Sequence, residues 1–145
     1  MAIFFLNLDD VLHIHQNQIT LYGGDPAVRD MGLLASAIAQ PQASYAGEFL
    51  HKDLFEMAAA YLFHIVKNHP FVDGNKRTGA VSALAFLDLN EVEVQADEQR
   101  LFDTTLAVAQ GHMGKPEAAR SMSAAVQRRR PDSIVGAGID LRSMR

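Results

Sequence analysis

The clearest pattern along the chain is a series of apolar stretches that repeat with the period of an α-helix. The strongest is segment 53–68, whose apolar side chains cover nearly the whole circumference of a helix. A helix that is apolar on every side is expected to lie buried at the centre of a domain. A second long stretch runs from about residue 75 to residue 89 and ends at Asn90. We therefore predict two central helices, joined by a short segment that contains Pro70.

Shorter helical patterns flank this pair. Residues 8–22 follow a potential cap at Asn7 and stop at a Gly-Gly pair, and a helix with a potential cap at Asp30 stops at Pro41. Two more helices are predicted, one after a potential cap at Asp97 and one from Pro116. Residues 3–6 are a candidate edge strand, and residues 91–94 alternate and are predicted to be extended. The predicted fold is an all-α, single-domain helical bundle around the 53–68 and 75–89 pair, with one short N-terminal extended segment at most.

Two segments lack the helical period. Residues 41–52 are polar, contain a glycine and have few apolar anchors, so we expect a mobile linker. After Arg130 the helical pattern fails, and the chain contains Pro131, Gly136 and Gly138. We therefore divide the chain into a helical domain at 1–127 and a basic C-terminal tail at 128–145, and we expect residues 131–145 of this tail to be dispensable.

Composition and charge narrow the function classes. The chain has 145 residues, the length of one domain, and no cysteine, so no disulfide framework is expected. It has no signal-like start and no apolar run near the ~18 residues of a membrane span, which favours the cytoplasm. Residues 1–113 carry 6 Lys and Arg against 14 Asp and Glu. This acidic body argues against direct nucleic-acid binding.

The segment that joins the two central helices has the richest chemistry. Residues 69–77 read His-Pro-Phe-Val-Asp-Gly-Asn-Lys-Arg. Two cations, Lys76 and Arg77, oppose the helix dipole in a first helical turn, which is unfavourable unless an anion binds there. Gly74 allows a sharp bend and a close approach of the backbone to a ligand. The pattern indicates a site for a phosphate-rich ligand.

Two residues of this segment have alternative interpretations. Asp73 is either the N-cap of the following helix or a ligand of Mg²⁺, and its neighbours Asn75, Lys76 and Arg77 favour the metal. His69 either ends a helix as a satisfied polar group or serves as a general base beside the anion site. The spacing of the other histidines fits no zinc site. The segment is also not a Walker P-loop, because Asn75 precedes Lys76 where that motif has glycine.

The run His69-x-Phe71-x-Asp73-x-Asn75-Lys76-Arg77 resembles the signature of the Fic/Doc family, and most of all its Doc (death on curing) branch. The resemblance covers roughly residues 5–110. It includes the motifs Tyr22-Gly23-Gly24, Val28-Arg29-Asp30, Gly32-Leu33-Leu34, Asn68-His69-Pro70-Phe71 and Phe86-Leu87-x-Leu89-Asn90. Lys76 stands where AMP-transferring Fic enzymes have a glycine, and Ala80 stands where they have a second arginine. Both departures are typical of Doc.

The resemblance implies an all-helical toxin of a toxin–antitoxin pair. Such a protein would use ATP and Mg²⁺ to pass the terminal phosphate to a Ser or Thr of elongation factor Tu, and so stop translation. The catalytic residues would be His69, Lys76 and Arg77, and the metal ligand Asp73. Gly74, Asn75, Lys76 and Arg77 would bind the nucleotide.

The family also implies a flap for docking the target between residues 41 and 52. Self-restrained Fic proteins carry a Ser/Thr-x-x-x-Glu-Gly/Asn segment. Here Phe49 follows the nearest match, Ser44 to Glu48, so restraint is expected from a separate antitoxin.

Two other functions stay open. The first is AMP or NMP transfer, the wider Fic chemistry, against which Lys76 and Ala80 speak. The second is a non-catalytic helical binding module, against which the intact His69, Asp73, Asn75 and Arg77 speak.

Overall fold

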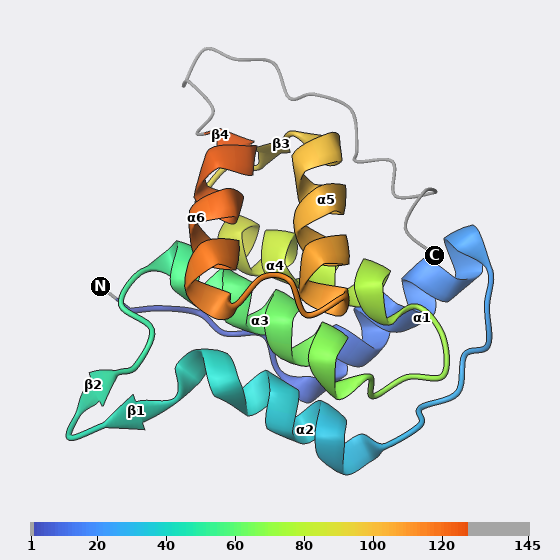
Figure 1. Ribbon diagram of the computed structural model, residues 1–145. Coiled ribbons are helices and arrows are strands. Elements are labelled where there is room, and N and C mark those ends of the chain that lie inside the picture. The colour runs from blue at the N-terminus through green and yellow to red at the C-terminus, as the bar shows by residue number, and fades with distance from the viewer. Residues whose placement is uncertain (1, 128–145) are drawn as a thin grey trace.

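The computed structural model describes residues 2–127 and shows a helical domain (Figure 1). The helices and strands, in chain order, are α1 (Leu8–Tyr22), α2 (Met31–Ala39), η1 (Gln40–Gln42), β1 (Ser44–Tyr45), β2 (Glu48–Phe49), α3 (Leu54–Asn68), α4 (Asn75–Leu89), β3 (Gln95–Ala96), α5 (Glu98–Ala109), α6 (Lys115–Ala125) and β4 (Val126–Gln127). Within residues 2–127 the strands form only two pairs, β1 with β2 and β3 with β4, both antiparallel. The prediction of an all-α fold is confirmed.

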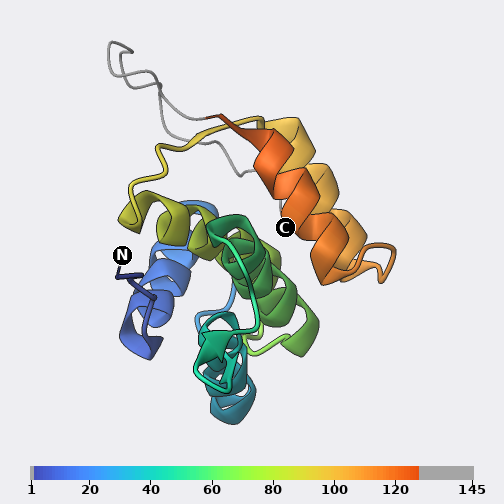
Figure 2. The same cartoon turned by 90° about the vertical axis from the view of Figure 1, so that its left-hand side faces the viewer.

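The two central helices, α3 and α4, pack against each other and carry most of the core. The α5–α6 hairpin covers one side of the pair, and α1 and α2 lie on the other side (Figures 1 and 2). The largest side chains with almost no exposed surface include Tyr61, Met57, Phe71 and Phe86. Because α3 is enclosed by α2, α4, α5 and α6, its nearly continuous apolar surface has a partner on each side.

Four helices begin at a residue whose side chain accepts a backbone N–H of the first turn. These N-caps are Asn7, Asp30, Asp53 and Asp97, so the predictions at Asn7, Asp30 and Asp97 are confirmed. The helices α4 and α6 instead begin after glycines, without a side-chain cap.

The predicted extended segments are wrong in detail. Residues 3–6 form no strand, because side chains replace a strand partner: the Phe4 N–H donates to Asn90 Oδ1, Asn90 Nδ2 donates to the Phe4 carbonyl, and the Leu6 N–H donates to the Tyr61 hydroxyl. Residues 91–94, predicted to be extended, begin in a turn in which Glu91 has φ +64°, and the first strand residue is Gln95.

The linker predicted at 41–52 contains a small hairpin. Ala46 and Gly47 both have positive φ (52° and 80°) between β1 and β2, the backbone of a two-residue type I′ turn. The Phe49 ring packs 5.5 Å from the Phe5 ring, and His51 is buried. Apart from these contacts the expectation of few anchors is confirmed, because residues 44–50 are all exposed and Tyr45 is 79% exposed. The mobility of the segment stays a prediction.

The predicted tail at 128–145 lies outside the described residues. No helix within residues 2–127 is both long and apolar enough to cross a membrane.

Candidate active site

The loop between α3 and α4 is held by the connection between α1 and α2. Val28 and Phe71 form an isolated antiparallel β-bridge, and the Val72 N–H donates to the Ala27 carbonyl at 3.1 Å. The N–H groups of Arg29 and Asp30 both donate to the Pro70 carbonyl, at 2.7 and 3.0 Å. The loop backbone is thereby fixed by a segment about forty residues earlier in the chain.

His69 ends α3 in the left-handed conformation, with φ +50°. Pro70 accounts for the end of the helix at this position, because a proline disfavours right-handed helical geometry at the residue before it. The Arg29 guanidinium donates to the carbonyls of His69 (2.6 Å) and Asn68 (2.9 Å). A cation at a helix C-terminus interacts favourably with the dipole, so Arg29 stabilises a backbone conformation that is otherwise uncommon.

The His69 imidazole is exposed to solvent, but one of its nitrogens is anchored. Nδ1 lies 3.1 Å from the Phe71 carbonyl oxygen and 3.0 Å from the Asn75 side-chain nitrogen. When the proton is on Nδ1, that nitrogen donates to the Phe71 carbonyl and the lone pair is on Nε2. This tautomer has the proton acceptor that a general base requires.

Asn75 is buried and braces the loop from the first position of α4. Its Oδ1 accepts the Phe71 N–H at 3.0 Å, and its Nδ2 donates to the Phe71 carbonyl at 2.9 Å. The side chain therefore satisfies both backbone groups of a buried loop residue. The same nitrogen approaches His69, so Asn75 also sets the position of the candidate base.

The interpretation of Asp73 as a helix cap is wrong. The N-cap of α4 is Gly74, in the left-handed conformation with φ +83°, and no side chain caps this helix. Asp73 Oδ2 instead accepts the N–H of Asp25 at 2.8 Å, and Asp25 lies in the connection between α1 and α2. Gly24 lets this carboxylate approach closely, since a Cβ there would lie 3.1 Å from Asp73 Cβ.

The two cations at the start of α4 differ in their surroundings. Arg77 is only 4% exposed, donates to the Gly23 carbonyl at 2.9 Å and lies 5.5 Å from the centre of the Tyr22 ring. Its guanidinium thus lies against the C-terminal end of α1, a position favoured by that helix dipole. Lys76 is half-buried.

A pocket of about 230 Å³ lies between these groups. It is lined by Tyr22, Gly23, Gly24, Asp73, Gly74 and Arg77. The structure therefore brings the predicted metal ligand, the flexible glycine and the predicted phosphate-binding arginine to one cavity. His69 and Lys76 do not line it, although His69 is linked to this region through Asn75.

Asp73 is a single carboxylate, so a metal ion bound to it would need further ligands from outside the protein. Within residues 2–127 no three His, Cys, Asp or Glu side chains gather at one point. A Mg²⁺ ion bound through one carboxylate takes its other ligands from phosphates and water. The pocket fits this arrangement, because the glycines at 24 and 74 leave space beside Asp73 and the first turn of α4 has no side-chain cap.

Three residues of this region were not predicted as site residues. Arg29 and Asp25 contact the loop as described above, and His15 of α1 donates from Nε2 to the Asp73 carbonyl at 2.8 Å. Burial lowers the pKa of His15, more than its hydrogen bond to Asp73 raises it. One feature of the sequence could have indicated a role for His15, because this polar residue lies on the apolar face of its helix with Val11 and Ile19.

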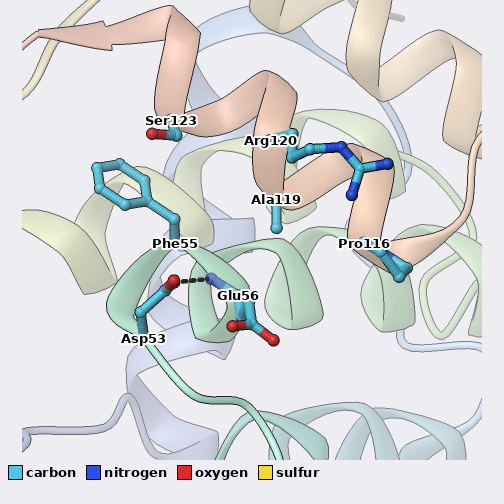
Figure 3. Close-up of a pocket in the computed structure, with 7 residues that line it drawn as sticks. All are labelled: Asp53, Phe55, Glu56, Pro116, Ala119, Arg120 and Ser123. Carbon is cyan, nitrogen blue, oxygen red and sulfur yellow. Dashed lines mark hydrogen bonds between the residues drawn. The ribbon is translucent and has the colours of Figure 1, made fainter.

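A separate pocket of about 320 Å³ lies between the start of α3 and α6 (Figure 3). Its lining residues are Asp53, Phe55, Glu56, Pro116, Ala119, Arg120 and Ser123. Asp53 accepts the Glu56 N–H there and so serves as the cap of α3. None of the residues predicted for catalysis lines this pocket.

Comparison with known proteins agrees with this geometry. The model of the Fic/DOC family matches residues 5–87. The chain is 42% identical over 93 residues to a toxin Doc of Mycolicibacterium smegmatis, covering 64% of this chain and 69% of that protein. It is 39% identical over 105 residues to the protein kinase doc of Escherichia phage P1, covering 72% and 82%. The chain therefore belongs to the Fic/Doc family, and within that family it resembles the Doc toxins.

Proposed function

We propose that this protein is a Doc-type toxin that transfers the terminal phosphate of ATP to a Ser or Thr hydroxyl of a translation factor, elongation factor Tu. The observation that carries the proposal is the loop 69–75, where a candidate base precedes a helix that begins without a cap. A relative of 39% identity is named a protein kinase, which supports the same chemistry. The proposed toxin acts in the cytoplasm, and a separate antitoxin neutralises it.

The proposed reaction uses His69 as the base. Its Nε2 takes the proton of the target hydroxyl, the hydroxyl oxygen forms a bond to the terminal phosphorus, and the bond from that phosphorus to the bridging oxygen breaks. ADP then leaves with the electron pair of that bond. When the proton is on Nδ1, its contact with the Phe71 carbonyl leaves Nε2 as the proton acceptor that this step requires.

The proposed nucleotide site is the start of α4 and the pocket beside it. Gly74 and Asn75 provide a helix start to which phosphate oxygens can hydrogen-bond, and Lys76 and Arg77 add positive charge. Asp73 would hold Mg²⁺, which when bound neutralises part of the phosphate charge. Most of the catalytic effect would come from positioning and electrostatics, as is general for phosphoryl transfer.

The test is the intact mass of elongation factor Tu after incubation with ATP, Mg²⁺ and the full-length protein. We expect a gain of one phosphate. A gain of one AMP would support the alternative of AMP transfer, and no gain would favour a non-catalytic binding module. His69→Ala protein is the matched control, because without the candidate base the same incubation time should give no measurable gain.

Lys76 separates phosphate from AMP transfer. Lysine adds four methylenes and a charge where a glycine would leave room, and Ala80 is fully buried where a second arginine would be needed. With ATP labelled at the terminal or at the innermost phosphate, only the terminal label should reach the target, and Lys76→Gly should lose this transfer. Innermost label on the target of unmodified protein would contradict the proposed reaction.

A further inference from the structure

His15 lies on α1, 58 residues before its partner Asp73, yet it is among the most buried polar residues. It is 2% exposed. Its ring stacks on the Phe71 ring with centroids 3.7 Å apart and planes 6° from parallel, and its Nε2 donates to the Asp73 carbonyl at 2.8 Å. One side chain therefore contacts both Phe71, a buried residue of the loop, and the backbone of Asp73, the candidate metal ligand.

An apolar side chain would serve equally well if packing were the only requirement. His15 shares its helix face with Val11 and Ile19, and Phe71 beneath it is fully buried. Burying an imidazole in such a place is unfavourable unless its polar atoms are satisfied. The hydrogen bond to Asp73 satisfies Nε2, so the polar part of His15 has a specific acceptor, and this acceptor belongs to the loop.

Asp73 is held from two sides. His15 fixes the main-chain carbonyl, and the Asp25 N–H fixes Oδ2 at 2.8 Å. A Cβ on Gly24 would lie 3.6 Å from Asp73 Cγ, and a Cβ on Gly74 would lie 3.5 Å from the His15 ring. With the carbonyl and one carboxylate oxygen fixed, the direction of the carboxylate in the pocket is restricted.

We propose that His15 is a positioning residue for Asp73: its hydrogen bond orients the carboxylate that holds the nucleotide-bound Mg²⁺. This inference rests on the proposed function, because it takes Asp73 as the metal ligand. Groups that orient a metal ligand through a hydrogen bond change metal affinity by about 10- to 100-fold when they are removed. His15 should therefore affect metal binding more than it affects folding.

Two substitutions separate the hydrogen bond from the ring stacking. His15→Phe keeps a flat ring on Phe71 but cannot donate to the Asp73 carbonyl. His15→Gln keeps an N–H donor at a similar reach but loses the ring stacking. His13→Phe is the matched control, because His13 is exposed on the same helix.

The measurement is the binding of Mn²⁺ to the full-length protein with a non-hydrolysable ATP analogue, followed by electron paramagnetic resonance, together with thermal unfolding. We expect His15→Phe to weaken Mn²⁺ binding about tenfold, in the range for groups that orient a metal ligand. His15→Gln should bind Mn²⁺ more tightly than His15→Phe even if it unfolds at a lower temperature. His13→Phe should match the unmodified protein.

The outcomes are distinguishable. If His15→Phe binds Mn²⁺ as tightly as unmodified protein, the residue has only a packing role and the inference is wrong. Equal weakening in His15→Phe and His15→Gln would also overturn it, because the donor would then make no difference. If the unmodified protein neither binds Mn²⁺ with the analogue nor modifies elongation factor Tu, the proposed function fails, and this inference fails with it.

Discussion

The two central helices have the same length but begin in opposite ways. α3 starts at Asp53, whose side chain accepts the Glu56 N–H at 2.8 Å, and Glu56 adds an acid to the first turn. α4 starts at Gly74 with no side-chain cap and with no acid in its first turn, where Lys76 and Arg77 lie instead. Both are 15-residue helices in the same core, so neither length nor burial explains the difference.

The start of α3 has the arrangement that stabilises an isolated helix, and the start of α4 lacks it. A side-chain cap stabilises a helix by about 1 kcal/mol, and acids in the first turn add a smaller favourable interaction with the dipole. α4 does without both, which its packing on α3 permits. A helix start without cap or acid can interact with an anion from outside, whereas the start of α3 already has its acceptor.

The largest expected effect is at the loop itself. His69→Ala removes the candidate base, so we expect phosphate transfer to fall by about 10²- to 10⁴-fold, the usual contribution of general base catalysis. Growth arrest on expression should be lost. Circular dichroism should show an intact fold, because the imidazole is exposed. Transfer by His69→Ala at the unmodified rate would show that another group accepts the proton. His13→Ala, an exposed histidine on α1, should keep full activity.

Gly74→Ala should weaken the start of α4 in both stability and nucleotide binding. An alanine at φ +83° is strained by about 1–2 kcal/mol, and its Cβ would lie 3.3 Å from Ile19 Cδ1. We expect a loss of this size in the free energy of unfolding, together with weaker binding of the ATP analogue. Gly47→Ala is the matched control: its φ is +80° and its Cβ would meet nothing within 4 Å. The same loss of nucleotide binding in both variants would argue against a role for the start of α4.

Asp53→Ala tests the other half of the comparison. Removing this cap should lower the free energy of unfolding by about 1 kcal/mol, measured by urea denaturation. The rate of phosphate transfer by the folded protein should not change, because Asp53 lies in a different pocket from Asp73. A large loss of transfer at a temperature where the variant is folded would mean that the start of α3 also takes part in function.

The smallest expected effect concerns the pH dependence of stability. Burial lowers the pKa of His64 on α3 to about 4 from an ordinary 6.5, with further contributions from Lys115 and His51. Below pH 6.5 the unfolded chain takes up a proton that the folded chain binds only near pH 4, so the free energy of unfolding should fall across this window. His64→Phe should make the decrease in melting temperature between pH 7 and pH 5 smaller than in unmodified protein. An unchanged decrease would show that His64 does not contribute to the pH dependence.

The sequence predicts those features of the fold that depend on neighbouring residues. Helix periodicity gave the central pair, and the caps at Asn7, Asp30 and Asp97 lie where the side chains indicated. The strand predicted at residues 3–6 is absent because Asn90, 86 residues away from Phe4, supplies the hydrogen bonds of a strand partner. A contact between residues so far apart in the chain cannot be predicted from the residues that surround Phe4.

The same limit applies to the candidate site. The loop residues could be selected from the motif alone, because all of them lie within nine consecutive positions. The supporting contacts of His15, Asp25 and Arg29 come from α1 and the following connection. The N-cap of α4 is the left-handed Gly74 rather than Asp73. The sequence could not predict this, because the Asp73 side chain accepts its hydrogen bond from Asp25, 48 residues earlier in the chain.

The contacts between the loop and the α1–α2 region also determine when the site can form. Hydrogen bonds from His15, Asp25, Arg29 and Arg77 across this junction join residues 39 to 59 positions apart. Contacts of such sequence separation require the closure of long loops and tend to form late in folding. On a ribosome, the first seventy residues would lack the partners of α1. We expect the activity to appear only after α4 has been synthesised and packed, so an unfinished chain would be harmless to the cell that makes it.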